Sequence, residues 1–179
     1  MTERGVRALA LWLTALVVSL DQATKVLVNR LMDLHESKEL VSGLLSLTYV
    51  RNRGAAFGVF SDAQLPYQSW LFAAVSVVAL VAIAIYGWRL PAASHLPRLA
   101  LALIVGGALG NLLDRVRLGY VIDFVDFFWG RHHWPAFNVA DSSITIGVSL
   151  LVLDMLRQPR ASEAPSAPAH NVAAGPAGD

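Results

Sequence analysis

Three aspartates in two short motifs are the residues of this sequence best suited to catalysis. Asp114 and Asp123 lie within GNLLDRVRLGYVIDF, and Asp141 ends the motif FNVAD. Both motifs adjoin long apolar segments, where an ionised carboxylate is costly and therefore usually has a function. Two carboxylates held close together can share one proton and activate a water molecule, which is the chemistry of aspartic proteases. The three aspartates therefore indicate a possible hydrolytic site at the edge of a membrane.

The composition is that of an integral membrane protein. Of the 179 residues, 55% are hydrophobic and 15% are charged, whereas soluble domains average about 45–50% apolar and about 25% charged residues. A net charge of +1 without a basic stripe gives no reason to expect a nucleic-acid partner. The absence of cysteine excludes disulfides, zinc–thiolate sites and a thiol nucleophile.

Four apolar segments are close to the length of about 20 residues that a helix needs to cross a bilayer. They run over Val6–Val28, Gln68–Trp88, Pro97–Val116 and Val139–Leu156. We predict one membrane domain over residues 1–157 and an Ala/Pro-rich tail over 158–179, whose composition cannot build a core and indicates disorder. Basic residues flank the spans on both sides, so charge alone leaves their orientation open.

The connection between the first two spans, Asn29–Tyr67, is too long for a simple linker. Leu45, Leu47 and Tyr49 alternate there with polar residues, which predicts a half-buried strand. We expect a small sheet that lies on the membrane surface.

Counting the spans brings the candidate acids to one face of the membrane. The third span ends and the fourth begins on the same side, so Asp114, Asp123 and Asp141 must all lie near that interface. Asp21 and the first loop belong to the same side. The apolar neighbours of Asp123 should raise its pKa by desolvation. This convergence is the strongest argument for a site that the residues provide by themselves.

Other polar residues fall at helical spacings near the same interface. Asp21 and Lys25 are one turn apart in the order that favours an ion pair, which either positions the span or lines a site. Asn111, Asp114 and Arg115 share one helix face, and the arginine either holds the aspartate ionised or pairs elsewhere.

The fourth span begins with polar residues whose roles are open. Asn138 and Asp141 are three residues apart and would share a helix face, while Asp141 and Ser142 could instead cap the helix. In the third span, Gly106 and Gly110 would allow another helix to approach closely.

The sequence gives less support to other kinds of site or function than to paired carboxylates. The adjacent His132 and His133 cannot both face one metal ion from a regular helix, so no metal site is expected. No glycine-rich phosphate loop occurs. A small ion-coupled transporter is the alternative, because buried acidic and basic residues commonly mark an ion path. The clustering of the acids at one face and the lack of an internal repeat argue against it. A non-catalytic membrane scaffold is a third hypothesis.

Four motifs occur in order along the chain: DQATK (Asp21–Lys25), VRNRGAAFG (Val50–Gly58), GNLLDRVRLGYVIDF (Gly110–Phe124) and FNVAD (Phe137–Asp141). Together with the four spans, they closely resemble the lipoprotein signal peptidase (signal peptidase II) family. The resemblance implies a mostly α-helical membrane protein with four transmembrane helices, both termini in the cytoplasm, and a small extracytoplasmic β-cradle from the first loop.

The resemblance also implies an activity and a location. The family consists of aspartic endopeptidases of the bacterial cytoplasmic (inner) membrane, which cleave prolipoproteins on the N-terminal side of a diacylglyceryl-modified cysteine. The implied partners are these substrates and membrane lipid, without nucleic acid or an obligate protein partner. Neither a metal nor an organic cofactor is implied.

By resemblance, Asp123 and Asp141 form the catalytic dyad, and we expect Phe57 and its neighbours to close over the bound peptide. The residues implied to bind substrate or support the dyad are Asp21, Lys25, Asn52, Gly54, Asn111, Asp114, Arg115 and Asn138. Physical reasoning on the sequence does not by itself choose between Asp114 and Asp123 as the partner of Asp141.

Overall fold

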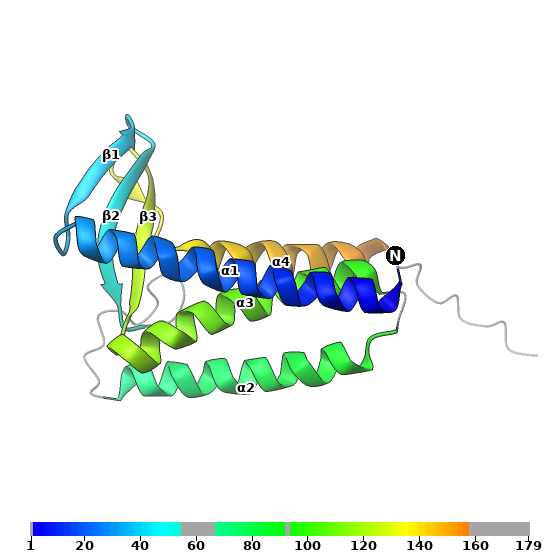
Figure 1. Ribbon diagram of the computed structural model, residues 1–179. Coiled ribbons are helices and arrows are strands. Elements are labelled where there is room, and N and C mark those ends of the chain that lie inside the picture. The colour runs from blue at the N-terminus through cyan, green and yellow to red at the C-terminus, as the bar shows by residue number, and fades with distance from the viewer. Residues whose placement is uncertain (1, 55–66, 92–93, 158–179) are drawn as a thin grey trace, which may run out of the picture.

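The computed structural model describes residues 2–54, 67–91 and 94–157. The expected closing role of Phe57 and the expected disorder of residues 158–179 lie outside the described residues. The four helices are α1 (Glu3–Leu31), α2 (Gln68–Arg89), α3 (His95–Leu118) and α4 (Val139–Arg157). Each is long and apolar enough to cross a membrane, which confirms the four predicted spans. The helices lie side by side along one direction (Figure 1).

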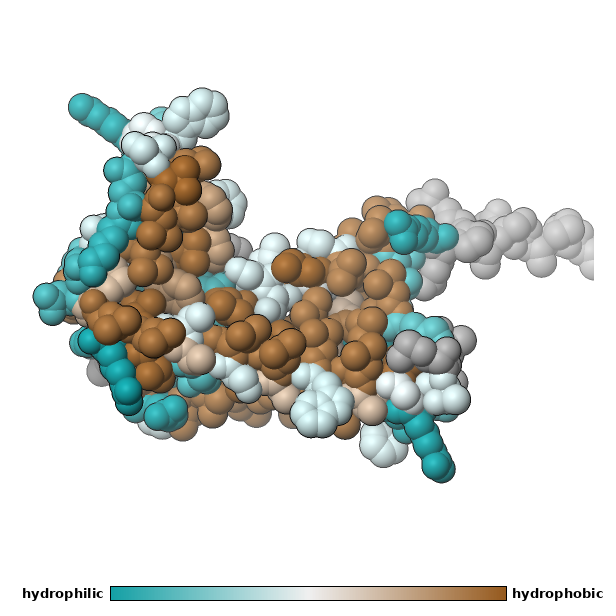
Figure 2. All heavy atoms as spheres, turned by 45° about the horizontal axis from the view of Figure 1, so that its top comes forward, coloured by the Kyte–Doolittle hydropathy of each residue, from teal (hydrophilic) through white to brown (hydrophobic). Residues whose placement is uncertain are grey.

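Helix α3 is the centre of the bundle, because α1, α2 and α4 all pack against it. Glycines permit the closest of these approaches: a Cβ added to Gly106 would collide with Val17 of α1, and one added to Gly107 would collide with the backbone of Ala140 in α4. The close approach of another helix predicted at the glycines of α3 is thus confirmed for α1. Gly107 allows a second close approach, that of α4. Apolar side chains cover much of the surface of the bundle (Figure 2), as contact with lipid requires.

An antiparallel sheet stands at the end of the bundle where α1 finishes (Figure 1). Its strands are β1 (Ser37–Val41), β2 (Leu45–Asn52), β3 (Val121–Trp129) and β4 (His132–His133), hydrogen-bonded in the order β1-β2-β3-β4. The strand predicted around Tyr49 is therefore present as β2. The first loop provides only half of the sheet, since β3 and β4 come from the connection between the third and fourth spans.

The pairing of β2 with β3 places the polar residues of two distant motifs next to each other. Val50 is the partner of Asp123, and Asn52 is the partner of Val121. Beneath this pair of strands, a small apolar core contains Met32, Tyr49 and Phe124, and it fixes the sheet on the end of α1. Hydrophilic residues gather on the side of the sheet that faces away from the helices (Figure 2).

Candidate active site

The site residues predicted from the sequence converge at the junction of the bundle and the sheet. They come from five elements or their ends, α1, β2, α3, β3 and α4, and all ten are buried. The set is Asp21, Lys25, Asn52, Gly54, Asn111, Asp114, Arg115, Asp123, Asn138 and Asp141. So many buried polar groups are costly unless they are hydrogen-bonded, and the side chains of this set have the contacts described below, although Arg115 Nε has no acceptor within the described residues.

Asp123 lies on β3 and is held by two side-chain amides. Asn52 Nδ2 donates to its Oδ2 at 3.0 Å, and Asn138 Nδ2 donates to its Oδ1 at 2.7 Å. The carboxyl group is only 2% exposed. Burial, followed by repulsion from Asp141, raises the pKa of Asp123 to about 7, as its apolar neighbourhood led us to expect.

Asp141 lies in the first turn of α4, where the positive end of the helix dipole favours a carboxylate. Asn111 Nδ2 donates to its Oδ1 at 2.9 Å. The cap of this helix is Asn138, whose Oδ1 accepts from the backbone N–H of Asp141 at 2.9 Å. Since another residue caps the helix, the carboxylate of Asp141 is not used as a cap.

A chain of amides connects the two carboxylates. Asn138 Nδ2 reaches Asp123 and also approaches Asn111 Oδ1 at 3.2 Å, and Asn111 in turn donates to Asp141. The two acids therefore lie on either side of a short polar bridge, close enough for the charge of one to act on the other. Repulsion between two neighbouring carboxylates favours the protonated form of one of them.

Asp114 occupies a different environment. Its carboxylate pairs with Lys25 Nζ at 2.9 Å and accepts from Gln22 Nε2 at 3.0 Å and from the backbone N–H of Ile122 at 3.2 Å. These contacts join α1, α3 and the beginning of β3. Asp114 thus has the surroundings of a structural anion.

Lys25 joins this anion cluster to the amide chain. Its Nζ lies 2.9 Å from Asp21 Oδ2 as well as 2.9 Å from Asp114, which confirms the predicted pairing with Asp21. The same ammonium group donates to Asn111 Oδ1 at 2.8 Å. Asp21 also accepts from the backbone N–H of Ala140, at the start of α4, at 3.0 Å.

Arg115 pairs away from its neighbour in sequence. Its Nη2 donates to the carbonyl of Gly54 at 3.0 Å, and its guanidinium lies 5.8 Å from the ring centre of Phe72 in α2. Gly54 N–H donates to Asn52 Oδ1 at 2.8 Å, so the arginine indirectly orients the amide that holds Asp123.

Sequence reasoning missed Gln22 as a site residue. Its amide contacts Asp21, Asp114 and the carbonyl of Gly110. The available signal was its position inside the DQATK motif, directly after the buried Asp21.

An apolar groove of about 250 Å³ reaches Asp141 from the side of α4. Its lining combines aromatic, hydroxyl and aliphatic groups: Trp134, Phe137, Asp141, Ser142, Thr145 and Ile146. A carboxylate at the end of an apolar groove can act on a substrate that carries both a polar backbone and an apolar chain.

The chain is similar to known proteins in sequence and in fold. The model of the family described as Signal peptidase (SPase) II matches residues 13–157. The chain is 57% identical over 141 residues to the lipoprotein signal peptidase of Geobacter sulfurreducens, covering 79% of this chain and 87% of that protein. It is 45% identical over 143 residues to that of Syntrophus aciditrophicus, covering 80% and 89%. A solved bacterial membrane enzyme superposes with a TM-score of 0.73 and 34% identity, over 83% of this chain and 88% of its own.

Proposed function

The chain belongs to the signal peptidase II family, and from that premise we propose that it is an aspartic endopeptidase that removes signal peptides from prolipoproteins. Cleavage falls on the N-terminal side of a diacylglyceryl-modified cysteine. The observation that carries the aspartic mechanism is the amide-bridged pair of buried carboxylates, Asp123 and Asp141, beside an apolar groove. The transporter hypothesis finds no support in the relatives, which are peptidases by name.

The two acids have different roles in this mechanism. With a pKa of about 7, Asp123 keeps its proton up to neutral pH, and Asp141 acts as the ionised partner at the positive end of α4. Asp141 removes a proton from a water molecule while the water oxygen attacks the scissile carbonyl carbon. Asp123 gives its proton to the carbonyl oxygen, which stabilises the tetrahedral intermediate.

Collapse of the intermediate completes the reaction. The carbonyl re-forms as its oxygen returns the proton to Asp123, the carbon–nitrogen bond breaks, and the departing amine takes the proton held by Asp141. Both carboxyl groups are then in their starting states. No atom of a metal or cofactor enters this balance.

The supporting residues act on the dyad through hydrogen bonds. Asn52 and Asn138 orient the carboxyl group of Asp123, and Asn111 orients that of Asp141. The remaining predicted supporting residues, Asp21, Lys25, Gly54, Asp114 and Arg115, position these amides or the elements that carry them.

We further propose that the protein lies in the bacterial cytoplasmic membrane with both termini in the cytoplasm and the dyad near the extracytoplasmic face. Four spans return the chain to the side on which it began, so the termini share a side. A prolipoprotein in the bilayer presents its diacylglyceryl chains at membrane depth, and the groove beside α4 has the apolar lining to receive them.

The decisive experiment replaces Asp123 and Asp141 singly by Asn and follows cleavage of a lipid-modified precursor by the purified protein. Each variant keeps the shape of the side chain and loses the titratable group, so cleavage should fall at least about 10³-fold while the protein accumulates in the membrane. Asp126→Asn is the matched control, because Asp126 lies on the same strand and pairs with His133 outside the dyad. Retained cleavage in the Asp123 variant would overturn the assignment of Asp123 to the dyad.

A further inference from the structure

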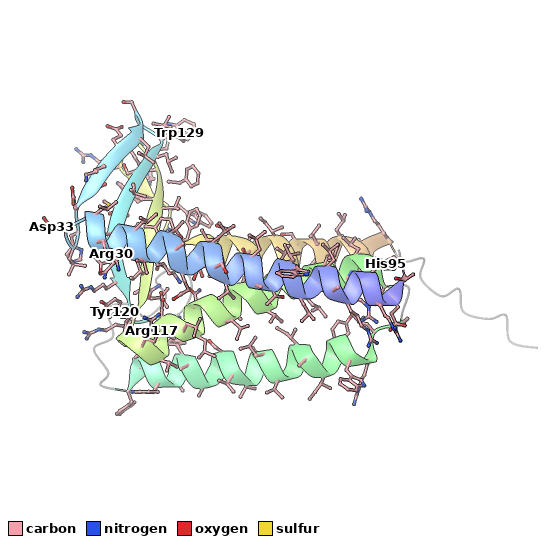
Figure 3. All side chains as sticks on the ribbon, viewed as in Figure 1. Arg30, Asp33, His95, Arg117, Tyr120 and Trp129 are labelled. Carbon is pink, nitrogen blue, oxygen red and sulfur yellow. The ribbon has the colours of Figure 1, made fainter. Side chains whose placement is uncertain are left out.

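A recess lies at the end of the bundle remote from Asp123 and Asp141. Helix α3 forms its floor, and α1 and α2 form its walls, because both pack on α3. The recess encloses about 350 Å³, and most of its lining is apolar, including Leu11, Ile83 and Leu101. Figure 3 shows His95, at the start of α3, at this end of the molecule, whereas Trp129 is at the other.

The depth of the recess matches part of one leaflet of a bilayer. Its lining on α1 extends from Arg7 to Thr14, which at 1.5 Å per residue is about 10 Å along the helix. Half of the hydrocarbon core of a bilayer is about 15 Å. At the deep end, Thr14 Oγ1 donates to the carbonyl of Ala102 at 3.1 Å and closes the space between α1 and α3.

Two arginines stand at the mouth of the recess. Arg7 and Arg98 line both the recess and an adjoining hollow of about 340 Å³, which Gly87 and Trp88 complete. The two spaces are neighbours, because Arg7, Gly87 and Arg98 line both of them. Trp88 is 91% exposed, as is typical of an aromatic residue at the membrane interface. The result is an apolar slot beside a basic hollow.

The arginines have contacts within the protein that leave further donors for a ligand. Arg98 Nη2 donates to the carbonyls of Leu90 at 2.9 Å and Pro91 at 3.1 Å, beyond the last turn of α2. Its Nε is buried and has no acceptor within the part of the chain that the structure describes. Arg7 pairs with Glu3 at 2.6 Å, but both side chains are exposed, so this pair is weak.

The charge at this end of the bundle is positive. The helix ends there carry five arginines and two acids among the described residues: Arg4, Arg7, Arg89, Arg98 and Arg157, with Glu3 and Asp154. A basic pocket between transmembrane helices is a recognised setting for anionic lipid headgroups.

We propose that the recess binds an anionic phospholipid of the surrounding membrane. Its phosphate lies in the hollow between Arg7 and Arg98, and one acyl chain fills the apolar slot between α1 and α2. This lipid completes the packing of two helices that contact α3 but leave space between each other. The site is separate from the catalytic groove beside α4 and does not depend on the proposed peptidase mechanism.

The test measures lipid binding to the full chain purified in an uncharged detergent. Dioleoyl phosphatidylglycerol and dioleoyl phosphatidylcholine have the same acyl chains, so a difference between them reports the headgroup. Native mass spectrometry counts the bound lipids, and the thermal unfolding midpoint is followed as each lipid is titrated. We expect one phosphatidylglycerol to bind at least about fivefold more tightly than phosphatidylcholine for each arginine that contacts it.

Variants distinguish the contribution of the lipid headgroup to binding from that of the acyl chain. Arg7→Gln and Arg98→Gln should each lower the preference for phosphatidylglycerol about fivefold. Glu3→Gln should increase the preference, because it releases Arg7. Ala84→Phe, which fills the slot from α2, should lower the binding of both lipids.

Matched controls report unspecific effects. Arg131→Gln removes an exposed arginine at the turn between β3 and β4, and Ala82→Phe adds the same ring to an exposed position of α2 outside the recess. Neither should alter lipid binding. Equal binding of the two lipids, equal loss in Arg7→Gln and Arg131→Gln, or the same stabilisation by inorganic phosphate alone would overturn the proposal.

Discussion

Lys25 is the single cation in direct contact with two buried carboxylates of the described site, and its replacement by Met tests how the site is held together. Its Nζ lies 2.9 Å from both Asp21 and Asp114, and the three side chains are 0–3% exposed. In Lys25→Met, the amide of Gln22 stays near both acids, but no positive charge replaces the ammonium group.

The size of the stability loss in Lys25→Met follows from the distances and the burial of its two ion pairs. At 2.9 Å and an effective dielectric constant of about 20, each contact contributes about 6 kcal/mol of attraction, much of which offsets the cost of burying the ammonium group. Breaking a buried pair from one side typically costs about 3–5 kcal/mol. We expect Lys25→Met to lose about 5 kcal/mol, because two carboxylates lose their partner at once.

The assay is the free energy of unfolding in mixed micelles, with Lys38→Met as the control. Lys38 also pairs with an acid, Glu36 at 3.0 Å, but its side chain is 54% exposed, so its loss should cost less than about 1 kcal/mol. Adding Asp21→Asn and Asp114→Asn to Lys25→Met should recover part of the loss, since the two carboxylates that lost their cation are then uncharged. Equal stability of Lys25→Met and Lys38→Met, or no recovery in the triple variant, would show that the buried ion pairs of Lys25 do not hold the site together.

Four further predictions concern the dyad and the packing around it. Cleavage should decline as pH rises through about 7, where Asp123 loses its proton, and a pH profile of kcat/KM tests this. The unfolding free energy should also decrease as pH rises from about 4 to about 7, because folding raises the pKa of Asp123 above its value of 3.8. Unfolding free energies measured across this pH range in the unaltered protein and in Asp123→Asn test this, since the variant should lack this decrease. Asn52→Ala should move the midpoint of the activity profile upward by about one pH unit, because it removes a hydrogen bond that stabilises the ionised form; an unchanged midpoint contradicts this. Gly110→Ala should destabilise the protein by about 1–3 kcal/mol, since its Cβ would collide with the Asp21 carboxylate, whereas Gly87→Ala should be tolerated; equal unfolding curves would count against it.

Local sequence rules were sufficient to predict the positions of the helices and which residues share one helix face. Apolar runs near 20 residues predict the spans, because backbone groups in lipid must be satisfied within a helix. The spacing of Asn111, Asp114 and Arg115 predicts a shared face, and all three are indeed buried. Alternation around Tyr49 predicts β2, since successive side chains of a strand point to opposite faces.

The partners of the charged residues depended on the tertiary structure. The sequence left Asp114 and Asp123 equivalent as partners of Asp141, because both adjoin apolar segments near the same interface. In the folded chain, Asp114 forms an ion pair with Lys25 across the contact of α1 with α3. Asp123 instead accepts hydrogen bonds from two amides, and the charge of Asp141 repels it more strongly than that of Lys25 attracts it.

The three aspartates in the two motifs were therefore identifiable from residue type and position, because both are local properties of the chain. The different surroundings of the three aspartates could not be predicted in this way. Asp123 on β3 contacts Asn52 only because β3 pairs with β2, and β2 lies about 70 residues earlier in the chain. Residue types and span lengths are enough to predict that carboxylates gather at one membrane face. Which carboxylate pairs with a buried cation and which lies beside another acid depends on the folded chain, since contacts between distant segments set the charge next to each carboxylate.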